Sequence, residues 1–296
     1  MNYNKLKPIS ETDLILNADG SAYHLNLLPG DIADTVITVG DPDRVGEVSK
    51  YFDSIELQKG RREFITHTGR IGKKRISVLS TGIGTDNIDI VLNELDALVN
   101  IDFETRIPNA NLKKLNIIRI GTSGAIQPDI KVDSLLVSSA AFGLDALAGF
   151  YKQCYSEEEK ELLKQFSAEF NEGMMINPYI ATANTMLLNK LADGMQQGIT
   201  VTAPGFYSPQ GRQVRAYSAI PQLMDIVTSF RADGKRITNM EMETAGIYSL
   251  AKILGHYAIS FNVILANRAI KEFSKQPAKI MDNYIKQLIE KISSNI

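Results

Sequence analysis

Short apolar runs alternate along the chain with segments in which apolar residues recur every three or four positions. The runs are rich in Val and Ile and have Gly, Pro or Asp near their ends, which is typical of buried strands. They cover residues 35–40, 75–82, 116–121, 134–141, 199–203 and 259–266. Strands that alternate with helices predict a layered α/β fold around a largely buried sheet.

Three segments have the helical period. Residues 88–99 place Ile and Leu on one face, residues 244–254 are followed by Gly255 as a helix-ending residue, and residues 280–292 form an amphipathic C-terminal helix. Residues 96–114 are polar and predict a loop-like insertion, whereas residues 151–197 predict mostly helix with a break at 171–178. Nothing resembles a linker, so we expect one domain over residues 1–296, with residues 1–20 as a polar extension.

Composition narrows the classes of protein. An apolar fraction of 44% in 296 residues allows a sizeable core, and a net charge of -2 gives no electrostatic footprint for nucleic acid. No apolar run has the length of a membrane span, and the start of the chain lacks the features of a signal peptide. The lone Cys154 allows no internal disulfide, and the three histidines show no metal spacing. We therefore expect a cytoplasmic protein without a metal site and without nucleic-acid or membrane partners.

The first candidate for chemistry follows the strand at 35–40. Gly40 lets backbone N–H groups approach an anion, the next helix can start at Pro42 or Asp43, and Arg44 can offer a bidentate donor pair. The alternative is an ordinary strand–turn–helix corner with a solvated arginine.

A second candidate is Arg119, which lies within the apolar run 116–121. A buried charge is costly unless it is paired. An oxyanion would pair it, and the hydroxyls of Thr122 and Ser123 and the glycine loop at 82–84 would add contacts beyond the carboxyl ends of the strands. The alternative partner is an Asp or Glu in a structural salt bridge.

Two glutamates precede the helix at 244–254. Thr238 and Glu241 have capping-box spacing, which accounts for Glu241 locally. Glu243 is not explained in that way, and a carboxylate suits the vicinal hydroxyls of a ribose.

Residues 205–212 combine an aromatic, an amide and a cation. Phe206 can pack on a planar base, while Gln210 and Arg212 suit the imide edge of a pyrimidine. The alternative is a surface loop with a partly buried Phe.

Four separated motifs, at residues 39–45, 62–64, 119–125 and 241–243, occur in the order and type of one family. The chain resembles the purine/uridine phosphorylase family in its uridine branch, from about residue 22 to residue 268. The resemblance implies a three-layer α/β/α fold with a central mixed sheet. It also implies reversible phosphorolysis of uridine to uracil and ribose 1-phosphate in nucleoside salvage.

The resemblance also implies roles for residues. The expected phosphate-binding residues are Gly40, Arg44, Arg119, Thr122 and, from a neighbouring subunit, Arg62. The expected ribose-binding residues are Met242, Glu243 and, again from a neighbour, His24. Phe206, Gln210 and Arg212 are expected to bind the base; Arg119, Gln210, Arg212 and Glu243 are the expected catalytic residues. We therefore expect a homo-oligomer with shared active sites, either dimer or hexamer.

Departures from the family pattern leave alternatives open. Residues 85–87 replace the usual Pro-Ser, which speaks against the monovalent cation that some members hold near this loop. Phosphate is then expected as a co-substrate, with no cofactor. Residues 266–268 lack the Ser-Asp pair of purine enzymes, which favours a pyrimidine base. A purine nucleoside phosphorylase, a nucleosidase and a non-catalytic nucleoside-binding protein are the remaining alternatives.

Overall fold

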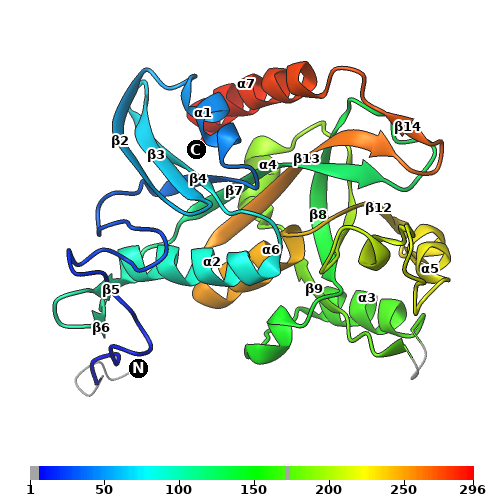
Figure 1. Cartoon of the computed structure of the whole chain (residues 1–296), viewed down its shortest axis with the longest axis horizontal. Helices are drawn as coiled ribbons and strands as arrows, with labels where there is room; N and C mark the ends of the chain where they lie inside the picture. Colours follow the sequence, from blue (N-terminus) through cyan, green and yellow to red (C-terminus); the bar gives the residue numbers. More distant parts are fainter. Residues whose placement is uncertain (1–6, 171–173) are drawn as a thin grey trace.

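The structure is a computed structural model that describes residues 7–170 and 174–296 (Figure 1). The first six residues of the predicted extension and the first three of the predicted break lie outside the described residues. In the described part, one large mixed sheet has helices on both faces, which confirms the three-layer α/β/α prediction (Figure 1).

The large sheet contains both parallel and antiparallel strand pairs. Its strands are β1 Thr35–Val39, β2 Ser54–Arg61, β3 Phe64–Ile71, β4 Lys74–Ser80, β7 Asn116–Ala125, β8 Leu135–Gly143, β9 Tyr179–Thr182, β10 Gln197–Thr202, β11 Arg231–Ala232, β12 Lys235–Glu241, β13 Tyr257–Asn267 and β14 Glu272–Phe273. The main spatial order is β11-β12-β10-β8-β13-β7-β1-β4-β3-β2. Because β12 also pairs with β7, the strands β12, β10, β8, β13 and β7 close into a ring.

The helices divide between the faces of the sheet. They are α1 Asp43–Ser49, α2 Thr85–Asn100, α3 Glu157–Ser167, α4 Thr185–Leu191, α5 Leu223–Ser229, α6 Thr244–Leu254 and α7 Pro277–Asn295, with short 3-10 turns at Leu147–Phe150 and Ser208–Gln210. α2 and α6 share one apolar core, α1, α4 and α7 share another, and α3 and α5 pack beside β8, β10 and β12 (Figure 1).

The predicted periods account for these elements. All five residues of β1 are buried, as expected for a strand with parallel neighbours β4 and β7 and helices on both faces. α2 buries the predicted face, including Ile88, Val91 and Leu95. Gly255, with φ 84°, ends α6 as predicted.

Two predictions about connecting segments are wrong. Residues 96–114 are not simply a loop, because α2 continues to Asn100 and the small hairpin of β5 (Ile101–Asp102) and β6 (Ile107–Pro108) follows. The Asn100 amide closes this segment by donating to Asp96 and to the Lys113 carbonyl. Residues 151–197 are not mostly helical either, because α3 and α4 are the only α-helices among the described residues of this range and β9 pairs with β8.

Candidate active site

The loops after the parallel strands β1 and β4 open onto a cavity of about 690 Å³, together with the last residues of β7 and β12. Parallel strands carry their carboxyl ends to the same edge of the sheet, where α/β folds bind ligands. The cavity brings together these predicted site residues: Gly40, Arg44, Arg119, Thr122, Phe206, Gln210, Arg212, Met242 and Glu243.

Two predicted site residues do not line the cavity of their own chain. Arg62 is exposed at the turn between β2 and β3, with φ 56°. His24 is held by α2, because its Nδ1 lies 2.6 Å from Oε1 of Glu94. Both residues remain candidates for the neighbour-supplied role.

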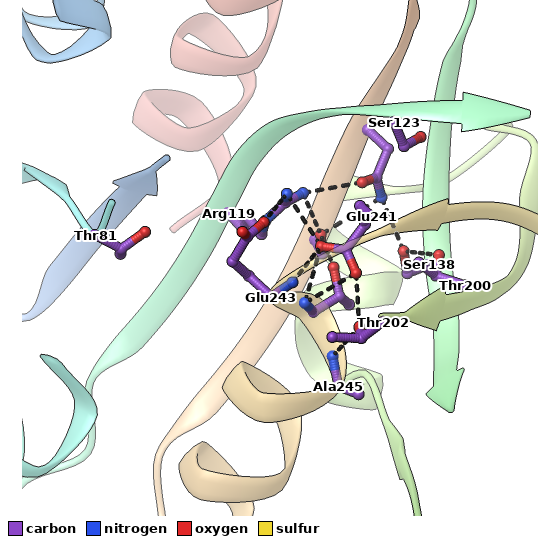
Figure 2. A network of polar contacts seen from close by, with 12 residues as sticks. Thr81, Arg119, Ser123, Ser138, Thr200, Thr202, Glu241, Glu243 and Ala245 are labelled. Atoms are coloured by element: carbon purple, nitrogen blue, oxygen red, sulfur yellow. Dashed lines mark hydrogen bonds and ion pairs between the residues drawn. The ribbon is translucent and has the colours of Figure 1, made fainter. Parts of the chain in front are cut away.

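Arg119 lies at the centre of a buried charge cluster (Figure 2). Its Nη2 lies 2.7 Å from Oε2 of Glu243 and 3.0 Å from Oε2 of Glu241. Burial alone lowers the pKa of this guanidinium, but the two carboxylates outweigh burial and raise the pKa. The structural ion pair that the sequence left open is therefore present, and Arg119 lines the cavity as well.

Arg44 is a second guanidinium at the same end of the cavity. Its Nε is buried and has no hydrogen-bond partner among the described residues, and burial lowers the pKa of the group. A buried donor without an acceptor costs about 1–3 kcal/mol. The Gly40 and Gly82 loops are close, since a Cβ on Gly40 would lie 3.5 Å from the Gly82 carbonyl oxygen. Two glycines that line the cavity and an unused donor fit a small oxyanion.

Glu243 connects this end to the middle of the cavity. It follows β12 as the residue before α6; Oε1 accepts from the Gly84 N–H at 2.9 Å and Oε2 accepts from Arg119. Burial raises the pKa of Glu243, while Arg119 opposes the rise. An ionised carboxylate has about four lone-pair sites, so both oxygens can still accept from a ligand hydroxyl.

Glu241 is not the capping-box residue that its spacing predicts. Thr238 lies inside β12 in extended backbone, and β12 continues to Glu241. The Glu241 carboxylate instead accepts from the N–H groups of Glu243 and Thr244, at 3.0 and 2.9 Å. It also accepts from Oγ1 of Thr202 at 2.6 Å. Glu241 thus orients the backbone that carries Glu243.

The other end of the cavity is aromatic and cationic. The guanidinium carbon of Arg212 lies 3.9 Å from the ring centroid of Phe206, and Nη1 donates to Oε1 of Gln210 at 2.7 Å. Gln210 is buried, although Phe206 is 52% exposed. Arg268 donates from Nη1 to the Gln210 carbonyl, and burial lowers the pKa of both arginines. This end suits the carbonyl groups of a planar base.

The sequence interpretation missed Asn262 and Arg268. Asn262 is a polar residue within the apolar run of β13, and it accepts from Arg119 Nη1 at 2.9 Å. A fully buried amide needs partners, so its place in that run was an available signal. The role of Arg268 had no local signal, because it depends on the fold of the distant segment at 205–212.

Two further observations bear on ligands and partners. In the part of the chain that the structure describes, no group of three or more His, Cys, Asp or Glu side chains is arranged to hold a metal ion. Among the described helices, none combines the length and apolar character that crossing a membrane requires.

Comparisons with known proteins agree with this geometry. Residues 34–292 match the family model described as the phosphorylase superfamily. The chain is 31% identical to a uridine phosphorylase of Thermococcus kodakarensis over 268 residues, which cover 88% of this chain and 83% of that protein. It is 29% identical to a DeoD-type purine nucleoside phosphorylase of Chromobacterium violaceum over 238 residues, 80% of this chain and 82% of that one.

A solved structure gives the same result. The nucleoside phosphorylase of Trypanosoma brucei, described as showing uridine phosphorylase activity, superposes with a TM-score of 0.86 at 30% identity. The match covers 95% of this chain and all of that one. The family match, the relatives and the cavity lead to one assignment: the chain belongs to the phosphorylase superfamily and is an enzyme of the nucleoside phosphorylase kind.

Proposed function

We propose that this enzyme catalyses the reversible phosphorolysis of uridine to uracil and ribose 1-phosphate, as part of nucleoside salvage in the cytoplasm. The main observation behind this proposal is that three kinds of side chain line one cavity. Arg44 and Arg119 suit a phosphate, Glu243 suits ribose hydroxyls, and Gln210 with Arg212 suits the imide edge of uracil. Phosphate is the co-substrate in this proposal, and no cofactor takes part.

The proposed reaction needs no side-chain nucleophile. A phosphate oxygen forms a bond to C1′ while the C1′–N bond breaks, and the electron pair of that bond leaves with uracil. Arg44, Arg119 and Thr122 hold the phosphate beneath an oxocarbenium-like ribose, which lowers the entropic part of the barrier. Gln210 and Arg212 stabilise the negative charge on the departing base, which later takes a proton.

The preference for uridine is proposed from the base end of the cavity. Relatives with purine and with pyrimidine names both occur, so the family alone leaves the base open. Arg212 and the Gln210 amide offer donors to two carbonyl oxygens. We expect kcat/KM at saturating phosphate to be at least about 10²-fold higher for uridine than for inosine, because donors without acceptors penalise the wrong base. Equal or higher values for inosine would select the purine alternative.

Gly121 provides a test of the Arg119 position. A Cβ on Gly121 would lie 2.1 Å from Nη1 of Arg119, so Gly121→Ala must push the guanidinium away from its partners. We expect kcat/KM to fall about 10²-fold, the scale for a 1 Å misplacement in a site. Gly46→Ala is the matched control, because a Cβ on Gly46 meets nothing within 4 Å. Steady-state kinetics that do not distinguish the two variants would argue against the assigned role of Arg119.

Glu243 is expected to recognise the sugar hydroxyls. Glu243→Gln removes the charge and one acceptor oxygen while keeping the shape of the side chain. The kcat/KM ratio of uridine to 2′,3′-dideoxyuridine should therefore fall by about 10-fold, the range for a hydrogen bond to a charged group. An unchanged ratio would show that the ribose hydroxyls bind elsewhere.

Arg62 and His24 are proposed to complete the cavity of a neighbouring subunit. Mixed oligomers test this, because subunits with Arg62→Ala and subunits with Arg212→Ala have complementary defects. When the two inactive proteins are unfolded and refolded together, one complete site can form at a mixed interface. We expect activity to return in the mixture and not in either protein refolded alone. No recovery in mixtures confirmed by mass spectrometry, or full activity of a monomer sized by light scattering, would contradict shared sites.

A further inference from the structure

A chain of buried hydrogen bonds runs around the strand ring, from Arg119 on β7 back to Ser123 on the same strand. It passes through one side chain on each of the other strands of the ring, and each of these side chains is fully buried. In order, the chain links Arg119, Asn262, Ser138, Thr200, Asn239 and Ser123, over distances of 2.9, 2.8, 2.6, 2.9 and 2.9 Å. Figure 2 includes Arg119, Ser138, Thr200 and Ser123 among its sticks.

The direction of the first half of this chain is fixed by Arg119. A guanidinium has donors only, so Asn262 must present its Oδ1 to Arg119. The Asn262 amide nitrogen then faces Ser138, whose Oγ must accept. The Ser138 hydroxyl hydrogen is thereby left for Oγ1 of Thr200.

The direction of the second half follows from the same count of donors and acceptors. Thr200 accepts from Ser138 and donates its own hydrogen to Oδ1 of Asn239. Because Oδ1 of Asn239 accepts from Thr200, the amide nitrogen of Asn239 faces Ser123. The Oγ of Ser123 accepts from this nitrogen. Every hydrogen in the chain points the same way, away from Arg119 and toward Ser123.

Ser123 ends the chain and lines the cavity, as Arg119 does at the other end. The residue is 8% exposed. Among the described residues, the bond from Asn239 is its only side-chain hydrogen bond. Since Asn239 occupies an acceptor site on Oγ, the hydroxyl hydrogen of Ser123 is the group left for a ligand.

We propose that Ser123 is a further substrate-binding residue, which donates a hydrogen bond to a substrate oxygen, and that Thr200 and Asn239 are positioning residues that fix this donor. The substrate oxygen belongs either to the phosphate or to a carbonyl of the base. Only the identity of this substrate oxygen rests on the proposed function. The direction of the donor follows from the hydrogen-bond chain.

Three variants test the donor. Ser123→Ala removes it, while Asn239→Asp replaces the amide nitrogen by a carboxylate oxygen, so that Ser123 must turn its hydrogen inward. Thr200→Val interrupts the chain without adding charge and serves if the charged variant does not fold. The matched control is Thr66→Val, which removes a buried hydroxyl that has no partner among the described residues.

KM and kcat are measured for phosphate and for the nucleoside separately, with uridine and with inosine. We expect Ser123→Ala and Asn239→Asp to weaken the same substrate, by about 10- to 100-fold if the acceptor is phosphate and by about 3- to 10-fold if it is a carbonyl. Thr200→Val should weaken that substrate in part, and Thr66→Val should leave both constants unchanged. The double variant Ser123→Ala/Asn239→Asp should be no worse than Asn239→Asp alone, because both act on one bond.

The outcomes separate this inference from the proposed function. If the wild type turns over neither nucleoside with phosphate, the proposed function fails, and the same ranking of variants is then expected in calorimetric binding of phosphate and of uridine. If Ser123→Ala stays within twofold of the wild type for both substrates, the inference is overturned. Fully additive losses in the double variant would also overturn it, because they would mean that Asn239 acts on the site independently of Ser123.

Discussion

Replacing Arg119 by methionine is expected to lower both the free energy of unfolding and the rate of phosphorolysis severely. Methionine keeps much of the side-chain volume but leaves Glu241 and Glu243 buried without their cation. Breaking a buried ion pair by removing one partner costs about 3–5 kcal/mol. The loss of a charge-stabilising donor from the cavity should lower kcat/KM by about 10²–10³-fold. Chemical denaturation and steady-state kinetics on uridine measure the two effects.

Arg236 supplies a matched control for this substitution. It pairs with Asp129 through two nitrogens at the surface, at 2.9 and 2.5 Å, and neither residue lines the cavity. A surface ion pair contributes about 0–1 kcal/mol, so Arg236→Met should change stability little and activity not at all. If the Arg119 variant is as stable and as active as the Arg236 variant, the central role of Arg119 is wrong.

Arg212→Ala is expected to produce the second large effect, this time on activity alone. The guanidinium stacks on Phe206 and donates to the Phe206 carbonyl at 2.6 Å and to Gln210, so its position is fixed before a base binds. Removing one preorganised donor to a developing negative charge lowers kcat/KM by about 10²–10³-fold. The loss should lie mainly in kcat, because charge on uracil grows only as the C1′–N bond breaks.

Arg215 lies three residues further along the same segment and provides the comparison. It is exposed and does not line the cavity, so Arg215→Ala should leave uridine phosphorolysis unchanged. Unchanged turnover in the Arg212 variant, or an equal loss in both variants, would remove Arg212 from the proposed mechanism.

The parts of the fold that were predictable are those whose burial is periodic. β1 and α2 carry continuous or helical apolar patterns, and both form as predicted. β2 was not predicted because it lies at the edge of the sheet, where five of its eight residues are exposed and no buried apolar run forms. β9 has only four residues, and its strand conformation depends on pairing with β8, which no local pattern encodes.

Site residues were predictable where their sequence neighbours identify them. They were not predictable where their contacts come from strands distant in the sequence. An arginine within an apolar strand identified Arg119, and the strand-end glycines identified the cavity edge. The ion pairs of Arg119 join residues more than a hundred positions apart, so the sequence favoured an oxyanion and left a carboxylate only as the alternative. The prediction for Glu241 was wrong because capping-box spacing is informative only at the start of a helix. Thr238 and Glu241 both lie within β12. The roles of Arg62 and His24 stay predictions, since a single chain does not contain their proposed partner site.

The central claim is that phosphate, held by Arg44 and Arg119, attacks the ribose of uridine. The most direct measurement is uracil release from uridine with and without phosphate, with the sugar product identified by ³¹P NMR. The account predicts release that requires phosphate and yields one equivalent of ribose 1-phosphate for each uracil. Release at the same rate without phosphate, with free ribose as the product, would contradict it.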